Sequence, residues 1–392
     1  MNETYKKDIE LDNWAHNLTD LDDFIDAVDA IQSETKWTPG VTTSGLRVEA
    51  MDGPIEAEQI ARRCGCSYAA AYDTGEGTKL MLKTGFLHEC LRDTAMPSLF
   101  RAAKVSGPAL GRMSQHSLKE VLNYCLEVAN GQTLVMRRGE KVSALMSDNN
   151  GGYKIMPQDE LVEIALRKMH DKFGSVHFIG GSINHNVTSF LVELPDAKEK
   201  LTDAYNEIVG HSGRTVDLMP AVRFMTSDTG DSAASLLPLY RDTKVQGVYF
   251  PVNQGLKVEH DRTRKGNLEG VERFAVVAGE LHAKFNDTNE TIAKMAATTI
   301  NHPLNAYILM TQKAGIAKKY SKEGYTDLEN YTGLNPCSMH DIYLSATRAI
   351  GAGVDAGLRG SALISLEDSV AKLLTMKWED FDIPGMVAWN AA

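Results

Sequence analysis

The sequence predicts an α+β fold: a helical N-terminal region, a central antiparallel sheet with hairpins and a long packing helix, and a helical C-terminal region. Two observations carry this prediction. Apolar residues repeat three or four positions apart over residues 56–130 and again beyond residue 339, which is typical of amphipathic helices. Between residues 133 and 250, short apolar segments alternate with glycine-, asparagine- and aspartate-containing turns, which is typical of strands.

These changes of period divide the 392 residues into four predicted parts. They are an acidic N-terminal arm (1–55), a helical region (56–131), a central α+β domain (132–302) and a helical C-terminal region (303–392). In the arm, Thr19 and Asp22 form a near capping box before a helix whose other face carries aspartates. That face is either solvated or a contact for a basic surface. In the helical region we expect helices over 55–63, 79–92, 96–103 and 117–128.

The central domain opens with a predicted β-hairpin over 133–146 that turns at Gly139. A helix over about 157–170 and a second hairpin over 176–194 follow. After a short helix near 197–209 come strands over 221–226, 233–240 and 244–250. Residues 228–231 have turn chemistry between the first two of these strands.

The strongest single pattern predicts a helix of about 30 residues. Its apolar positions follow an alternating four–three spacing: Val271, Phe274, Ala278, Leu281, Phe285, Thr288, Ile292, Met295 and Thr299. We interpret this stripe as a core face against the sheet, with a subunit contact as the alternative.

The net charge of −11 is unevenly distributed. Residues 1–60 hold 14 of the 52 acidic residues and four of the 41 basic ones, so the remaining 332 residues carry 38 acids and 37 bases. The body is therefore nearly neutral, and net charge does not exclude nucleic acid as its partner. Residues 61–150 are the most basic part, with obvious positive charges at Arg62, Arg63, Arg101, Lys104 and Arg112.

The composition predicts a cytoplasmic protein of a bacterial host cell, with no membrane contact. No run of apolar residues is long enough for a membrane span, and the first residues show no secretory signal. Five scattered cysteines fit a reducing compartment. Cys64 and Cys66 lack a second compact pair, so we expect buried thiols, no metal and no cofactor.

One basic stretch is the candidate nucleic-acid site. It combines cations on a strand-to-helix loop with two upstream aromatic residues that could stack on bases, and with two arginines on the first hairpin. These residues are Lys257, His260, Arg262, Arg264 and Lys265, then Tyr249 and Phe250, then Arg137 and Arg138. The alternative is a solvated loop whose cations pair with Glu259, Asp261 and Glu269.

Catalytic motifs are not found in the sequence. It contains no nucleophile elbow, no phosphate loop and no zinc-protease motif. This favours a non-enzymatic protein. A metal-dependent nucleotide or nucleic-acid enzyme stays open because Asp228 and Asp231 flank one turn.

Residues from about 90 to 380 resemble the phage- and plasmid-borne proteins grouped as domain of unknown function 932. The resemblance rests on segments in a fixed order: 94–97, 136–147, 153–157, 226–233, His260 with Gly266 and Asn267, and 343–347. It implies a mobile-element origin. Independently, three strands followed by a long helix over 221–300 resemble the core of phage single-strand annealing proteins, a fold-level analogy.

The leading hypothesis is a phage- or plasmid-derived protein that binds or anneals single-stranded DNA in recombination or replication, as a homo-oligomer. The alternative partner is a host defence or replication protein, held by the acidic arm.

Overall fold

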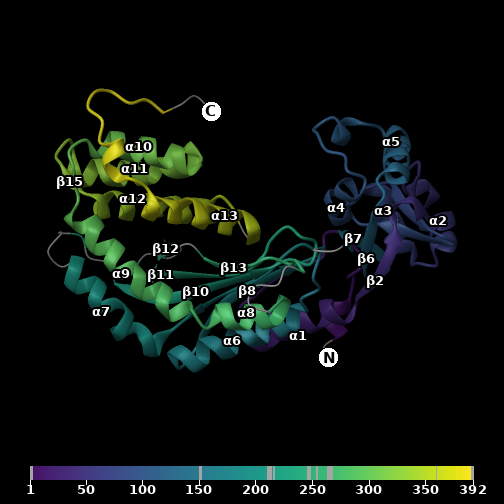
Figure 1. Ribbon diagram of the computed structural model, residues 1–392, viewed down its shortest axis with the longest axis horizontal. Coiled ribbons are helices and arrows are strands. Elements are labelled where there is room, and N and C mark those ends of the chain that lie inside the picture. Colours follow the sequence, from purple (N-terminus) through teal and green to yellow (C-terminus); the bar gives the residue numbers. More distant parts are fainter. Residues whose placement is uncertain are drawn as a thin grey trace.

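The computed structural model describes residues 3–149, 152–209, 214, 217–244, 249–252, 255–262, 268–358 and 360–389. These residues form a seven-stranded and a six-stranded β-sheet, a two-stranded sheet and a group of C-terminal helices (Figure 1). The terms smaller sheet and larger sheet refer to the six-stranded and the seven-stranded sheet. The smaller sheet belongs to one lobe, called here the small lobe, and the larger sheet with the remaining helices forms the large lobe. The predicted α+β class, with helices towards both ends of the chain, is confirmed.

The small lobe is built on six strands: β2 (Thr35–Thr42), β3 (Leu46–Ala50), β4 (Leu80–Thr84), β5 (Leu87–Leu91), β6 (Gln132–Arg138) and β7 (Lys141–Ser147). Their order in the sheet is β2-β6-β7-β5-β4-β3, and only β5 and β7 run parallel. The predicted hairpin over 133–146 is confirmed as β6 and β7. Gly139 makes its turn with a φ of 58°, a conformation that favours glycine.

Helices cover both faces of this sheet: α2 (Ala57–Cys64), α3 (Tyr68–Glu76), α4 (Met96–Ala102) and α5 (Gln115–Val128). Leu82 on β4 belongs to a core cluster with Leu122 of α5, whereas its neighbour Met81 belongs to a cluster with Ile60 of α2. Successive side chains of a strand point to opposite faces, so each face has its own core.

The predicted helix over 79–92 is wrong, because this segment forms the β4–β5 hairpin. Both of its faces are covered by helices, so apolar side chains occur on both sides of the strands. A strand buried on both faces loses the alternation that distinguishes it from a helix.

The large sheet contains β1 (Ala15–Leu18), β8 (His177–Asn184), β9 (Thr188–Glu193), β10 (Leu218–Thr226), β11 (Ala234–Asp242), β12 (Tyr249–Pro251) and β13 (Leu256–Val258). Its order is β1-β8-β9-β10-β11-β12, with β13 also paired to β11. The second predicted hairpin and the first two of the three later strands are confirmed. The third, predicted over 244–250, is replaced by the short strands β12 and β13; residues 245–248 lie outside the described residues.

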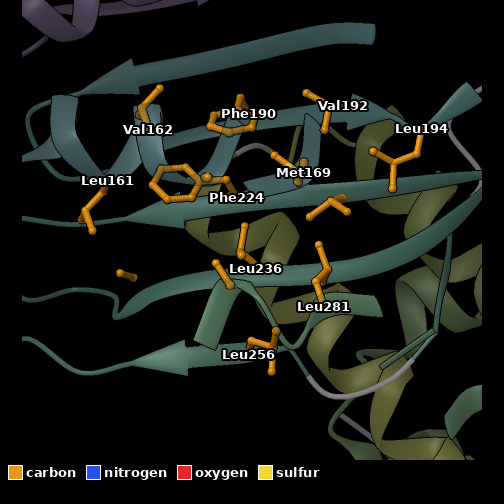
Figure 2. Packing of buried hydrophobic residues seen from close by; sticks show 14 of the residues in the cluster. Leu161, Val162, Met169, Phe190, Val192, Leu194, Phe224, Leu236, Leu256 and Leu281 are labelled. Carbon is orange, nitrogen blue, oxygen red and sulfur yellow. The ribbon is translucent and has the colours of Figure 1, made fainter. Parts of the chain in front are cut away.

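One face of the large sheet packs against α1 (Leu21–Ser33), α6 (Gln158–Phe173), α7 (Lys198–Val209), α8 (Gly270–Ala278) and α9 (Leu281–Ala297). Figure 2 shows Phe190 of β9 and Phe224 of β10 together with Leu161 and Met169 of α6. The two phenylalanine rings stack with their centroids 4.9 Å apart.

The predicted 30-residue helix is two helices, α8 and α9. At the junction, the backbone N–H groups of Gly279 and Glu280 donate to the carbonyls three residues earlier, at 3.0 Å each. This tighter turn interrupts the α-helical hydrogen bonds. The apolar stripe itself is confirmed as a core face, since Phe274, Leu281 and Phe285 are all buried in the cluster of the large sheet.

The acidic N-terminal arm is not a separate arm. Strand β1 pairs with β8 at the edge of the large sheet, while β2 and β3 are the two edges of the small-lobe sheet. Helix α1 buries Phe24 and Ile31 in the core, and Asp20 rather than Thr19 caps its N-terminus. Residues 1–55 therefore contribute strands to both of the larger sheets.

The C-terminal helices are α10 (Pro303–Ala314), α11 (Lys318–Thr332), α12 (Met339–Asp355) and α13 (Gly360–Ala371), and they share a core of their own. The short strands β14 (Thr299–Ile300) and β15 (Cys337–Ser338) pair at the entry to this group. Helices α12 and α13 lie over the face of the large sheet opposite α6 and α8 (Figure 1). A buried ion pair between Arg223 of β10 and Glu367 of α13, at 2.8 Å, joins the two parts.

Among the described residues, no helix combines the length and the apolar character that crossing a bilayer requires.

Candidate ligand-binding cleft

The two lobes meet around a buried ion pair between Arg138 of β6 and Asp228, which follows β10. The guanidinium group donates to Asp228 Oδ2 at 2.8 Å and to the carbonyl oxygen of His185 at 2.8 Å. Gln158 also donates to Asp228 Oδ2, at 2.7 Å. Because burial raises the pKa of Asp228 while Arg138 lowers it, the carboxylate depends on this arginine to remain charged.

A second contact between the lobes involves residues 9–12, which lie just before β1. Arg92 is fully buried and donates to the carbonyl oxygens of Ile9 and Leu11 at 3.0 and 2.9 Å. Lys141 is also fully buried, and its ammonium group lies 3.0 Å from Asp12 Oδ1. These buried cations hold residues 9–12 between the lobes, so the N-terminal segment fixes how the lobes sit relative to each other.

An aromatic stack leads from this junction towards the surface. Trp37 stacks on Tyr153, and Tyr153 stacks on His260 with ring centroids 5.2 Å apart. The hydroxyl group of Tyr153 lies 3.0 Å from His260 Nδ1, and Thr226 Oγ1 lies 3.2 Å from His260 Nε2. Burial lowers the pKa of His260 to about 4, so the imidazole is neutral near pH 7.

The interlobe cleft opens above this stack and has a volume of about 770 Å³. Arg101, Met146 and Ser147 come from the small lobe, while Tyr153 and His260 form part of the wall. The large lobe contributes the β10–β11 turn, β13 and α13, with side chains that include Met225, Asp231, Ser232, Lys257, Glu259, Ser365 and Asp368.

A smaller hollow of about 200 Å³ continues the cleft into the small lobe. Its lining includes Lys104, Gln132, Thr133 and Asn149. It shares Arg101, Met146 and Ser147 with the interlobe cleft, so the two hollows form one groove, called here the interlobe groove.

The charges in the interlobe groove are separated along its length. The smaller hollow contains the exposed cations Arg101 and Lys104. The larger hollow contains carboxylates, among them Asp231 and Glu259, together with hydroxyl groups, methionine side chains and Lys257, whose charge is paired with Asp368. Desolvation by the cleft walls raises the pKa of Asp231, and Arg101 opposes this shift. One end therefore suits an anionic group, and the other suits hydrogen-bond donors with an apolar surface.

Gly230 makes this arrangement possible. It has a φ of 77°, and a Cβ atom there would lie 3.0 Å from the Met146 methyl carbon and 3.3 Å from an Arg101 guanidinium nitrogen. The Asp-Thr-Gly-Asp turn predicted from the sequence thus leaves room for Arg101 to reach across the cleft, where it lies 3.4 Å from the carbonyl oxygen of Thr229.

Three of the residues predicted to contact nucleic acid are buried in this structure. Arg138 is committed to Asp228 inside the interlobe junction. His260 stacks on Tyr153 in the wall of the cleft and is 8% exposed, and Phe250 belongs to the core of the large sheet and is 6% exposed. Arg138 and Phe250 therefore offer no surface to a phosphate or a free base.

The other predicted cations that the structure describes are paired with carboxylates. Arg137 donates to both carboxylate oxygens of Glu89. Lys257 pairs with Asp368 at the cleft, and Arg262 pairs with Asp148. For Lys257 and Arg262 the alternative of a loop with paired cations is closer to the structure, with Asp368 and Asp148 as the partners. Arg264, Lys265 and the side chain of Tyr249 lie outside the described residues.

The predicted pair of carboxylates at Asp228 and Asp231 does not form a shared site. Asp228 is buried in its ion pair, whereas Asp231 faces the cleft. Within the described ranges, no group of three or more His, Cys, Asp and Glu side chains is arranged to hold a metal ion.

The residues that line the interlobe groove were only partly identifiable from the sequence. Arg101 and Lys104 stand out as positive charges in the basic part of the chain, but nothing in the sequence connects them with residues 225–233 or α13. Ser147 and Tyr153 could not be identified as groove residues from the sequence, because they line the groove only through the packing of the two lobes.

No protein-family model, no curated protein and no solved structure matches the chain. The resemblance to domain of unknown function 932 stays a prediction from the motifs.

Proposed function

We propose that the protein binds single-stranded nucleic acid in the interlobe groove. A phosphate would lie at Arg101 and Lys104, and the adjoining base and sugar would lie in the larger hollow. The observation that carries this proposal is the separation of charge along one continuous groove. A nucleotide has the same division, with an anionic phosphate at one end and hydrogen-bond donors on the base and sugar at the other.

The larger hollow suits a base and sugar in two respects. Carboxylate oxygens of Asp231 and Glu259 accept hydrogen bonds from exocyclic amino groups or sugar hydroxyls. Met146 and Met225 offer polarisable surface to the flat face of a base. Its volume of about 770 Å³ lies within the range of small-molecule sites.

Replacing Arg101 by alanine is expected to weaken oligonucleotide binding roughly 10- to 100-fold, because a charge-assisted hydrogen bond contributes about 1.5–3 kcal/mol. Fluorescence anisotropy with a labelled single-stranded oligonucleotide, at low and at physiological salt, measures this loss. The variant should also show a shallower dependence on salt, since one phosphate contact is removed.

Arg112→Ala is the matched control, because Arg112 is an exposed arginine of the same lobe that does not line the groove. We expect it to bind like the unmodified protein. Equal losses for Arg101→Ala and Arg112→Ala, or no binding at low salt, would overturn the proposal.

A second experiment tests the larger hollow by itself. Asp231→Asn keeps the size of the side chain but exchanges one carboxylate oxygen for a donor, so it accepts less well from the amino groups of adenine and cytosine. We expect the preference for cytosine-rich over thymine-rich oligonucleotides to fall while the salt dependence stays unchanged. An unchanged preference would mean that the base does not contact Asp231.

Oligomerisation also remains part of the proposal. The mass of the protein in solution, measured by light scattering with and without single-stranded DNA, is expected to increase with DNA if the protein assembles along the strand. A mass that corresponds to one chain in both conditions would restrict the function to binding without assembly.

A further inference from the structure

A cluster of sulfur atoms lies in the small lobe, away from the interlobe groove. Cys64 is the last residue of α2, and Cys66 follows after Gly65. Cys90 on β5 pairs directly across the sheet with Met81 on β4. The sulfur atoms of Cys66 and Cys90 are 3.9 Å apart, and those of Cys64 and Met81 are 3.8 Å apart.

The local backbone explains why two helix-end cysteines reach the same point of the sheet. Gly65 has a φ of 66°, the left-handed conformation that ends a helix and that glycine adopts at low cost. The chain reverses there, and the backbone N–H of Cys66 donates to the carbonyl of Ala61 at 3.1 Å. Cys64 and Cys66 therefore both lie on the apolar cluster that contains Cys90.

We propose that Cys66 and Cys90 form a thiol-oxidation site, at which a hydroperoxide converts the two thiols into a reversible intramolecular disulfide. A disulfide needs a sulfur–sulfur distance of about 2.05 Å, so the sulfurs must approach by about 1.9 Å. The segment between α2 and α3 that contains Gly65 and Cys66 can supply this movement. Cys66 is partly exposed, so a small oxidant reaches it first, whereas Cys90 is buried beside it.

The reaction balances as a two-electron oxidation by one hydroperoxide. The Cys66 sulfur attacks one oxygen of the peroxide and the O–O bond breaks, which gives a sulfenic acid and one molecule of water or alcohol. The Cys90 sulfur then attacks the sulfenic sulfur. An S–S bond forms, the S–O bond breaks, and the departing hydroxide leaves as water with the Cys90 proton.

The surroundings of Cys90 favour its role in the second step. The neighbouring Cys64 lowers the pKa of Cys90, and the nearby positive charge of Lys141 acts in the same direction, so both effects remain after Cys66 has become a sulfenic acid. The thiolate is the nucleophilic form of cysteine, so these neighbours increase the fraction of Cys90 that is able to attack.

The test uses the full chain treated with hydrogen peroxide in the presence of a chelator, then alkylated and digested without reduction. Mass spectrometry is expected to show a Cys66–Cys90 cross-linked peptide pair in most of the monomer, and dithiothreitol should restore both thiols. Cys66→Ser should remove this species. Cys125→Ser is the matched control, because Cys125 is a partly buried thiol of α5 in the same lobe, and it should leave the cross-link unchanged.

Two outcomes would overturn the proposal. One is oxidation of Cys66 and Cys125 at equal rates to sulfinic or sulfonic acid with no cross-link. The other is a disulfide that joins two chains or that links Cys64 to Cys66. Because Cys66 is partly exposed, Cys66→Ser is expected to fold. Its circular dichroism spectrum is recorded before the oxidation experiment to check this.

Discussion

Replacing Arg138 by alanine is expected to lower the free energy of unfolding by roughly 3–5 kcal/mol, the range for removing one partner of a buried ion pair. The loss arises because Asp228 is then left in a buried position, where Gln158 is its one remaining side-chain donor among the residues that the structure describes. The guanidinium group also donates to Thr35 Oγ1 at 2.9 Å and to the His185 carbonyl, so β2 and the β8–β9 turn lose hydrogen bonds as well. Urea titration followed by circular dichroism measures the change.

Arg137→Ala is the control for this prediction, because it changes the neighbouring residue of the same strand. Arg137 pairs with Glu89, and both side chains keep some contact with solvent, so we expect a smaller loss than for Arg138→Ala. Adding Asp228→Ala to Arg138→Ala should recover part of the stability, since no buried charge then lacks a partner. Equal losses for the two arginine variants would contradict the description of the interlobe junction.

Acidification is expected to destabilise the protein through its buried histidines. Burial lowers the pKa of His260 and of His340 to about 4, and it lowers the pKa of His185 as well. In the unfolded chain a histidine titrates near pH 6.5. Between about pH 6.5 and pH 4, the histidines of the unfolded chain are protonated, whereas His260 and His340 of the folded protein stay neutral. The stability due to neutral histidines is therefore complete above about pH 6.5 and is lost as the pH falls towards 4, by about 3 kcal/mol for each of His260 and His340.

His340→Gln isolates one of these contributions. Buried carboxyl groups act in the opposite direction, because burial raises the pKa of Asp228 and Glu367, so the total pH dependence mixes several groups. Between about pH 7.5 and 5, the variant is expected to lose about 2 kcal/mol less stability than the unmodified protein. His116→Gln, at an exposed position, is expected to behave like the unmodified protein. An equal loss in both variants would show that His340 is accessible to protons in the folded state.

The apolar stripe from Phe274 to Met295 was predictable from its period, because the opposite face of α8 and α9 is exposed and carries polar residues. The hairpin over 133–146 was predictable for a different reason. Its strands are buried along almost their whole length, and Gly139, with its positive φ, marks the turn between two runs rich in apolar residues. The segment over 79–92 was predicted wrongly because Leu80, Met81 and Leu82 are consecutive buried residues, whose spacing does not distinguish a strand from a helix.

Whether a predicted binding residue can reach a ligand depends on its solvent exposure, which the sequence does not show. Arg137 and Arg138 are adjacent arginines on one strand, yet one is partly exposed and the other is fully buried. The difference follows from strand geometry, since neighbouring side chains point to opposite faces, and from Asp228, which arrives from a distant part of the chain. Charge alone identified cations but not which of them faces solvent.

The sequence by itself determined the α+β class, strands β6 to β11, the apolar core stripes and the uneven distribution of charge, because each depends on residues close together in the chain. The tertiary structure alone decided that the acidic N-terminal segment is part of both sheets and that Arg101 and Lys104 share a groove with the β10–β11 turn. It also decided that Cys66 meets Cys90. The physical reason is that these features depend on contacts between residues far apart in sequence, whose pairing is set by the packing of both lobes together.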